Sequence, residues 1–290
     1  MPEAAAWPQL RELAQAADAA GLDLIGIQDH PYQARYVDTF ALIATLLAQT
    51  ERIRVFPDVA NLPLRLPSLL AKTAASLDLM SGGRFELGLG AGAFWDAIEA
   101  MGGPSRGPGE AVDALAEAIQ VIRLMWSGER SVRFEGDHYS VRGVHPGAPP
   151  PHEIEIWVGA YKPRMLSLVG RLADGWIPSL GRSSPDELRR SHELIDEAAA
   201  AAGRDPASVR RLLNVGGAIT EPGAGDTRPP TSPMSSLAGP PEYWHELLDG
   251  LGEIGFSGFV FWPAEATSGA VERFAHEVAP QVRRQGYPKP

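Results

Sequence analysis

The feature that most constrains the fold of this chain is a regular alternation of short apolar segments with longer segments of helical periodicity. Seven apolar segments are typical of buried strands, and nearly all of them are followed by a predicted helix. The predicted strands cover residues 22–28, 53–59, 84–90, 155–160, 174–180, 211–220 and 256–263. Several of these runs are almost continuously apolar, as parallel strands covered on both faces are. The alternation therefore predicts an α/β fold with a parallel sheet.

The length of the chain favours one closed barrel over an open sheet. Its 290 residues suit a single (β/α)8 domain, residues 1–290. A doubly wound sheet of this length would usually divide into two domains or carry a nucleotide fingerprint at its first strand. The first predicted helix, residues 7–20, has no predicted strand before it. The barrel therefore either begins upstream of residue 1 or closes in another way.

Two segments interrupt the alternation. Residues 131–141 alternate around Gly136-Asp137 like a β-hairpin, which we interpret as an insertion. Residues 221–241 are rich in Gly, Pro and Ser, and this loop is long enough either to act as a lid over a site or to be a disordered excursion.

Composition excludes several classes of function. The chain has no cysteine, which removes disulfides, thiolate catalysis and cysteine zinc sites. Its seven histidines show no metal-binding spacing, and its net charge of -10 argues against nucleic acid as a partner. No apolar run reaches the ~18 residues of a membrane span, and residues 1–20 do not resemble a secretory leader. We therefore expect a cytoplasmic protein that binds a small molecule and no metal.

The carboxyl ends of the predicted strands carry the candidate site, because in a (β/α)8 barrel those ends open onto the active site. Asp29 and His30 follow the first predicted strand, and Pro31 stops the strand there. One interpretation is a turn-capping carboxylate with an exposed histidine beside it. The other is a catalytic pair, in which the imidazole gives or takes a proton near neutral pH with the carboxylate as its neighbour.

The next two strand ends carry polar and glycine-rich motifs. Asp58, Val59 and Asn61 form either a polar turn or a set of hydrogen-bonding groups for a heterocycle. The glycine run that includes Gly90 and Gly92 matches the dinucleotide fingerprint weakly, because it ends an interior strand. Its glycines would still let a flat ring approach the backbone closely.

An anion site is predicted where the fourth strand meets its helix. Gly159, Ala160, Tyr161 and Lys162 lead into a helix whose first turn holds Pro163. Free backbone N–H groups and cationic side chains would then meet at a helix N-terminus, which binds anions. The alternative is a solvated loop with surface cations.

Four segments together resemble the bacterial luciferase-like family of flavin and deazaflavin oxidoreductases. They are the run that ends in Gln28-Asp29-His30, residues 62–92 with LDLMSGGRFELGLG, residues 124–139 with the hairpin, and residues 155–176 with EIWVGAYKPRM. The resemblance covers most of the chain. It implies a TIM barrel that binds a planar isoalloxazine-type ring at the carboxyl ends of its strands, and it implies a homodimer.

The resemblance also implies roles for single residues. The family's strand-end histidine falls on His30, with Asp29 beside it. A bulge with a non-proline cis peptide under the ring falls on Asp58-Val59, and a ring-contacting polar position falls on Asn61. The glycine-rich strand end falls on residues 88–92, and the phosphate-holding helix start falls on residues 159–162.

Two departures from the family bear on the substrate and on the fold. The family's first strand is missing before Trp7, so any ligand contact from that strand is missing as well. Ala93 followed by Phe94-Trp95 occupies the place where sugar-phosphate dehydrogenases of the family carry a carboxylate. The resemblance therefore implies an apolar or aromatic substrate rather than a sugar phosphate.

The Asp-His pair resembles the branch of the family that uses coenzyme F420, and FMN is the alternative cofactor. F420 has an acidic tail, for which the candidate cations are Arg35, Arg65, Lys162 and Arg164. The favoured function is hydride transfer between this cofactor and a small organic substrate. One alternative is a monooxygenase that uses FMNH2 and O2, and another is a barrel that binds flavin without catalysis.

Overall fold

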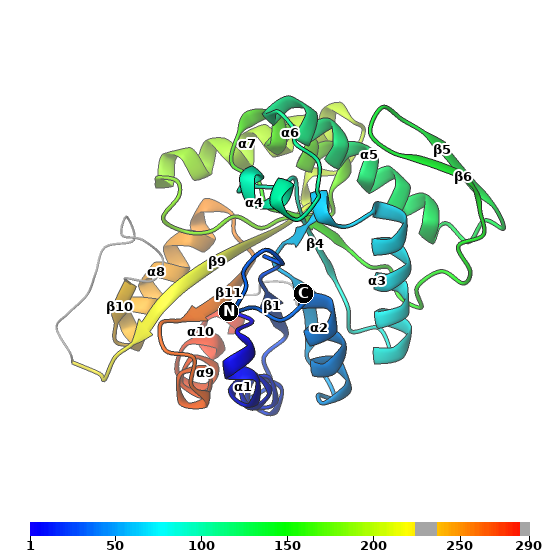
Figure 1. Ribbon diagram of the computed structural model, residues 1–290. Helices are drawn as coiled ribbons and strands as arrows, with labels where there is room; N and C mark the ends of the chain where they lie inside the picture. The colour runs from blue at the N-terminus through cyan, green and yellow to red at the C-terminus, as the bar shows by residue number, and fades with distance from the viewer. Residues whose placement is uncertain (224–236, 285–290) are drawn as a thin grey trace.

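The computed structural model describes residues 1–223 and 237–284, and within them the chain forms a barrel of parallel strands surrounded by helices (Figure 1). The wall strands are β1 (Leu24–Ile27), β2 (Arg54–Pro57), β4 (Leu87–Gly90), β7 (Ile156–Val158), β8 (Gly175–Trp176), β9 (Arg210–Ile219) and β11 (Gly258–Pro263). They correspond to the strands predicted from the sequence. The predicted hairpin is also present, as β5 (Val132–Glu135) and β6 (Ser140–Val144).

The wall strands follow one another around the barrel in the order β1, β2, β4, β7, β8, β9 and β11. β1 pairs in parallel with β2, and a bridge between Val55 and Phe85 links β2 to the chain just before β4. The other wall strands form one parallel sheet, which also holds the short strand β3 (Ala60–Asn61) beside β4. All carboxyl ends of the wall therefore lie at the same edge.

Helices cover the outside of the wall. They are α1 (Trp7–Ala19), α2 (Thr39–Ala48), α3 (Pro67–Ser81), α5 (Pro108–Trp126), α6 (Pro163–Leu172), α7 (Pro185–Ala201), α8 (Pro241–Ile254), α9 (Ser268–Arg273) and α10 (Ala279–Arg284). A separate apolar cluster of Phe56, Trp157, Ile177, Leu212 and Val260 comes from the wall itself and fills the enclosed space. None of the helices in the described part of the chain is long and apolar enough to span a bilayer.

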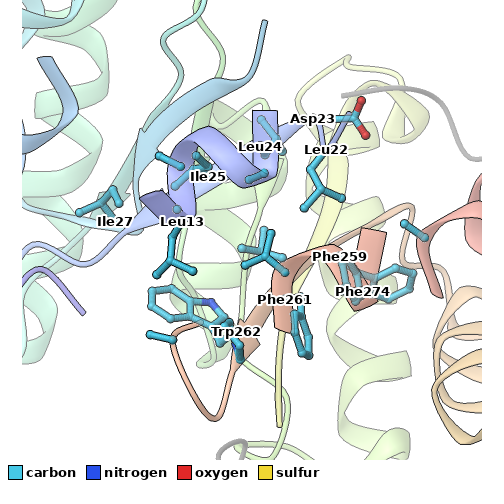
Figure 2. A pocket seen from close by; sticks show the side chains of 18 of the residues that line it. Leu13, Leu22, Asp23, Leu24, Ile25, Ile27, Phe259, Phe261, Trp262 and Phe274 are labelled. Carbon is cyan, nitrogen blue, oxygen red and sulfur yellow. The ribbon is translucent and has the colours of Figure 1, made fainter. Parts of the chain in front are cut away.

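The barrel wall is open between β1 and β11. Each of these strands pairs with one neighbour, and among the described residues no strand lies between them. A cavity of about 280 Å³ occupies this place, with apolar side chains such as Ile25 of β1, Phe259 of β11 and Leu13 of α1 around it (Figure 2). In an eight-stranded barrel the strand that precedes α1 would lie here, so the gap is at the place of the strand that was expected before the first helix.

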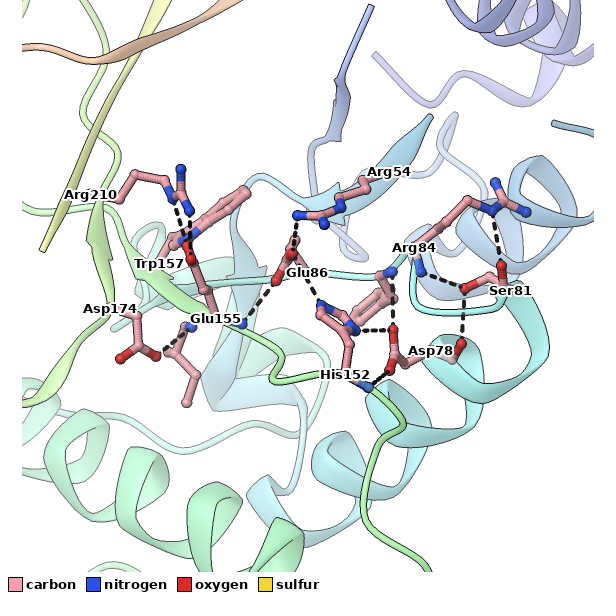
Figure 3. A network of polar contacts seen from close by, with 12 residues as sticks. Arg54, Asp78, Ser81, Arg84, Glu86, His152, Glu155, Trp157, Asp174 and Arg210 are labelled. Atoms are coloured by element: carbon pink, nitrogen blue, oxygen red, sulfur yellow. Dashed lines mark hydrogen bonds and ion pairs between the residues drawn. The ribbon is translucent and has the colours of Figure 1, made fainter. Parts of the chain in front are cut away.

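Charged side chains connect the amino ends of the strands (Figure 3). Glu86, just before β4, accepts hydrogen bonds from Arg54 Nη1 at 3.0 Å and from the backbone N–H of Glu155 at 2.8 Å. Glu155 accepts two hydrogen bonds from Arg210, each at 2.7 Å. His152 Nε2 lies 3.2 Å from Glu86, which is the main reason that the pKa of His152 is raised above its usual value. The amino ends of barrel strands serve stability, so we assign this network to the fold.

The predicted loop over residues 221–241 is shorter than expected. Residues 224–236 lie outside the described residues, but Leu237–Gly239 form β10, which pairs in parallel with the end of β9. Gly217 permits this pairing, because a Cβ atom there would lie 2.1 Å from the carbonyl oxygen of Leu237. Composition predicted a loop at Leu237-Ala238-Gly239 because three residues are too few to show strand periodicity.

Candidate active site

Asp29, after β1, is buried and fully hydrogen-bonded. Its carboxylate accepts two hydrogen bonds from Arg65, at 2.7 Å each, and one from the backbone N–H of Asn61 at 2.9 Å. The residue is only 2% exposed. A direct contact between this carboxylate and a substrate would require the ion pair to break, so Asp29 can act on the site through its charge and through its contact with Asn61.

His30 lies partly buried next to Asp29. Its Nδ1 atom is 2.7 Å from the hydroxyl oxygen of Tyr32, and its ring meets the Phe94 ring edge-on at 5.8 Å between centroids. Burial lowers the pKa of His30 below the usual value, and the charge of Asp29 opposes this shift only in part. The imidazole is therefore neutral near pH 7, and within the described part of the chain only its Nδ1 atom has a hydrogen-bond partner.

The chain leaves β2 through a cis peptide bond between Asp58 and Val59, at the position that the resemblance implies. The Asp58 carboxyl group lies beside β9, where its Oδ1 atom is 3.3 Å from Asn214 Nδ2. Asp58 Oδ2 and Asn61 Oδ1 are buried and have no hydrogen-bond partner among the described residues. Burial raises the pKa of Asp58 to about 7. Buried acceptors without partners are costly, so a ligand with N–H or O–H donors would satisfy them.

Asn214 and Trp262 belong to this site, although the sequence analysis did not single them out. Asn214 lies in β9, and its Oδ1 atom accepts a hydrogen bond from Trp262 Nε1 of β11 at 2.9 Å. The amide thus connects the bulge to the far side of the barrel. The available signal was an asparagine inside the apolar run LLNVGG, because a buried amide needs partners.

The glycines of β4 and Gly159, just after β7, make room for Val59. A Cβ atom on Gly88 would lie 2.2 Å from the carbonyl oxygen of Pro57, and one on Gly90 would lie 2.7 Å from Val59 Cγ2. A Cβ atom on Gly159 would lie 3.7 Å from the same side chain. On this side of the site the space that the glycines leave is therefore filled by the bulge, whereas the sequence analysis expected them to admit a flat ring.

The chain after β4 turns into α4 (Trp95–Ala100), a short helix that the sequence analysis did not predict. Gly92 has a φ of 109°, and Phe94 has a φ of 56°, which is rare and strained for a bulky residue. Phe94 is also 64% exposed. Its ring lies 5.8 Å from His30 and 6.1 Å from Tyr32, so these three side chains form an aromatic lip at the mouth of the barrel.

The predicted anion site lies at the start of α6. The Ala160 carbonyl accepts a hydrogen bond from Trp176 Nε1 at 2.9 Å, and the Tyr161 hydroxyl accepts one from the Ser179 N–H at 2.8 Å. Lys162 immediately precedes the first residue of α6, and its ammonium charge is a minor cause of the lowered pKa of Glu187, after the hydrogen bonds from Ser184. The segment is thus anchored to the neighbouring strand, with its helix N-terminus available to an anion.

Three of the four cations proposed for an acidic tail have carboxylate partners. Arg35 pairs with Glu3 at 3.5 Å, Arg164 pairs with Asp113 at 2.5 Å, and Arg65 is held by the buried carboxylate described above. The lysine at the start of α6 is the fourth. A strongly anionic ligand would therefore rely on that lysine and on backbone N–H groups.

Comparison with known proteins gives a family and a related enzyme. A family model described as luciferase-like monooxygenase matches residues 1–222. An F420-dependent glucose-6-phosphate dehydrogenase from Microbacterium testaceum is 29% identical over 213 residues, which cover 71% of this chain and 63% of that enzyme. The match therefore spans less than two thirds of the length of that relative.

Solved structures share the fold. An F420-dependent secondary alcohol dehydrogenase in complex with an F420-acetone adduct has a TM-score of 0.83 at 19% identity, over 96% of this chain and 95% of that chain. The oxygenating constituent of 3,6-diketocamphane monooxygenase from the CAM plasmid of Pseudomonas putida, in complex with FMN, has a TM-score of 0.73 at 20% identity. That match covers 94% of this chain and 92% of the monooxygenase chain.

Proposed function

Because this chain belongs to the luciferase-like monooxygenase family, we propose that it transfers hydride between coenzyme F420 and a small apolar or aromatic organic substrate. The observation that carries the proposal is the grouping of the neutral His30 imidazole with two buried acceptors that have no partner among the described residues, Asp58 Oδ2 and Asn61 Oδ1. A flavin-type ring offers N–H donors to such acceptors and, when bound, takes or gives the hydride.

His30 manages the proton in this proposal. Oxidation of an alcohol to a carbonyl releases one hydride and one proton, and the neutral Nε2 atom takes the proton from the substrate hydroxyl. In the reverse direction the same atom returns it to the carbonyl oxygen. Tyr32 fixes the orientation of the ring, because its hydroxyl contacts Nδ1 at 2.7 Å.

The bulge and the start of α6 are the segments that would hold the cofactor. Asp58 and Asn61 would contact the polar edge of the ring, and Val59 would support its face. The backbone N–H groups of residues 159–162, together with the Lys162 ammonium, would hold the phosphate group. The sequence relative that is F420-dependent supports F420 as the cofactor.

The aromatic lip supports an apolar or aromatic substrate. His30, Tyr32 and Phe94 place three rings within 5.5 to 6.1 Å of one another at the mouth. Aromatic faces and edges bind flat or apolar groups better than polyols. Ala93 adds no charge or hydrogen-bonding side chain at the position where the sugar-phosphate enzymes carry a carboxylate.

Titration of the purified protein with F420, and separately with FMN, tests the proposal. We expect F420 to bind with a Kd below about 100 μM, a free energy of about −5.5 kcal/mol, and FMN to bind at least about tenfold more weakly. Asn61→Ala should weaken F420 binding about tenfold, because one buried hydrogen bond is lost. Gln120→Ala is the matched control, since that exposed amide donates to the Ala116 carbonyl of its own helix. If neither cofactor binds in this range, the proposal is wrong.

A monooxygenase that uses FMNH2 and O2 is the second candidate, and the FMN complex of a protein with the same fold supports keeping it. Tighter binding of FMN than of F420 would favour this reading. Cofactor binding without turnover of any alcohol, ketone or aromatic substrate would favour a barrel that binds flavin without catalysis.

We also infer a homodimer through the outer side of α3. Leu66, Leu69 and Met80 lie on one side of this helix and its first turn, and they are 65%, 63% and 74% exposed. Sedimentation velocity should show a dimer for the wild type and a monomer for Leu69→Glu, because the charge would be buried at the contact. A monomeric wild type at micromolar concentration would exclude this contact.

A further inference from the structure

Arg65 contacts three groups around the site and is not a free cation. Its Nε and Nη2 atoms donate to the two carboxylate oxygens of Asp29 at 2.7 Å each, and Nη2 also donates to Asp38 at 2.8 Å. Its guanidinium group lies over the Phe40 ring, 4.3 Å from the centroid. Only 19% of the Arg65 side chain is exposed. The side chain is therefore held in one place by charge, hydrogen bonds and stacking.

These contacts join three elements whose loops form the site. Asp29 ends the β1 segment, one residue before His30, and also accepts the backbone N–H of Asn61 at 2.9 Å. Asp38 caps α2, because it accepts two backbone N–H groups of the first turn at 3.0 Å each. We call Arg65, Asp29 and Asp38 the clamp. The clamp sets where His30 lies relative to Asn61.

The clamp also controls the charge next to His30. Among the described residues, the charge of Asp29 acts on the imidazole and the Tyr32 hydroxyl contacts its Nδ1 atom. Arg65, from the turn after β3, pairs with Asp29 and also with Asp38. A buried carboxylate without a cation would draw a proton onto the imidazole. Arg65 supplies the positive charge that Asp29 needs, at hydrogen-bond distance. The imidazole of His30 can therefore stay unprotonated beside this carboxylate.

We propose that Arg65 is a positioning residue for the reaction, which neutralises Asp29 and fixes the segment of His30 beside the segment of Asn61 without touching substrate or cofactor. This inference rests on the proposed role of His30. It also makes Arg65 a poor candidate for binding the acidic tail of F420, because its Nε and Nη2 atoms already donate to two carboxylates.

A pH titration of the His30 ring by NMR, in protein without cofactor, tests the electrostatic half of the proposal. The His30 signal is identified by its loss in His30→Gln. We expect Arg65→Met to raise the pKa of His30, and the double variant Asp29→Asn/Arg65→Met to return it toward the wild type. Arg65→Lys should leave it low, because lysine keeps the charge. An unchanged His30 titration in Arg65→Met overturns the proposal.

A control variant and a second comparison separate the effect of Arg65 from a general loss of charge or of folding. Arg54→Met is the matched control, because it removes the cation from a buried carboxylate, Glu86, at the opposite end of the barrel. It should leave the His30 titration unchanged, and an equal shift in this variant would overturn the specific role of Arg65. If the buried charge prevents Arg65→Met from folding, Asp29→Asn and the double variant are compared instead. We then expect a lower His30 pKa in Asp29→Asn than in the double variant, because the guanidinium charge remains without Asp29, and equal values would contradict neutralisation by Arg65.

Measurements of kcat test whether Arg65 also positions the His30 segment. Arg65→Lys should lower kcat about 10- to 100-fold with cofactor affinity unchanged, because lysine cannot hold two carboxylates in the fork geometry of arginine. A fall in F420 affinity with unchanged kcat would overturn the proposal and make Arg65 a tail-binding residue. Since the NMR titration needs no cofactor, its result stands or fails separately from the proposed function.

Discussion

Replacing His30 by alanine is expected to lower turnover about 100- to 10,000-fold while cofactor affinity stays nearly unchanged, because a positioned acid or base contributes a factor of this size. The Nδ1 atom is fixed by Tyr32 at 2.7 Å, and burial keeps the ring neutral, so Nε2 is a base at pH 7 without first losing a proton. Alanine leaves no group to take the proton of the substrate. Steady-state kcat and the Kd of the cofactor are the measurements.

Two further variants separate the role of His30 from a loss of structure. Tyr32→Phe keeps the aromatic lip but removes the hydroxyl at Nδ1, so it should lower kcat by less than His30→Ala does. His276→Ala removes an exposed histidine from the Phe274–Val278 segment and should have no effect. Wild-type turnover in His30→Ala would exclude His30 from the chemistry. A loss that appears only in the cofactor Kd would make it a binding residue.

The positions of the candidate site could be predicted from the sequence because they depend on local pattern. An apolar run that ends in a polar group and a proline marks a strand end, and strand ends of a parallel barrel share one edge. His30, Asp58 and Asn61 were found in this way, and the structure brings their segments together. Their roles in binding and catalysis remain predictions.

The partners of these residues could not be predicted, because they are distant in the sequence. Arg65 and Asp29 are 36 residues apart, and Asn214 and Asp58 are 156 residues apart. Arg65 looked like a cation for an anionic tail, since the sequence shows its charge but not the carboxylate that it meets. A buried ion pair is defined by packing, which periodicity does not encode.

The glycines of β4 show the same limit at a smaller scale. The run LGLG indicates that something approaches the backbone closely, but it does not say what approaches. The resemblance suggested a flat ring. In the structure the Pro57 carbonyl and the Val59 side chain come closest to these glycines. The missing side chains therefore leave space for the bulge, and they affect a ligand only because the bulge is placed correctly.

The second large effect is therefore expected from Gly88→Ala, as a loss of stability of about 3 kcal/mol together with weaker cofactor binding. The new Cβ atom would lie 2.2 Å from the carbonyl oxygen of Pro57 and 3.1 Å from Val59 Cγ1. A backbone carbonyl inside a barrel cannot move aside as a flexible side chain can, so the strain falls on the bulge. The free energy of unfolding in urea and the Kd of F420 are the measurements.

Gly250→Ala provides a control of opposite sign for this prediction. Gly250 lies inside α8, and a Cβ atom there would have nothing within 4 Å. Alanine should therefore stabilise the protein by about 0.5–1 kcal/mol, because glycine is unfavourable in a helix interior.

If Gly88→Ala loses stability but binds F420 as the wild type does, the bulge supports the barrel without shaping the ring site. If it loses neither, the contact between β4 and the bulge is not as close as the structure shows.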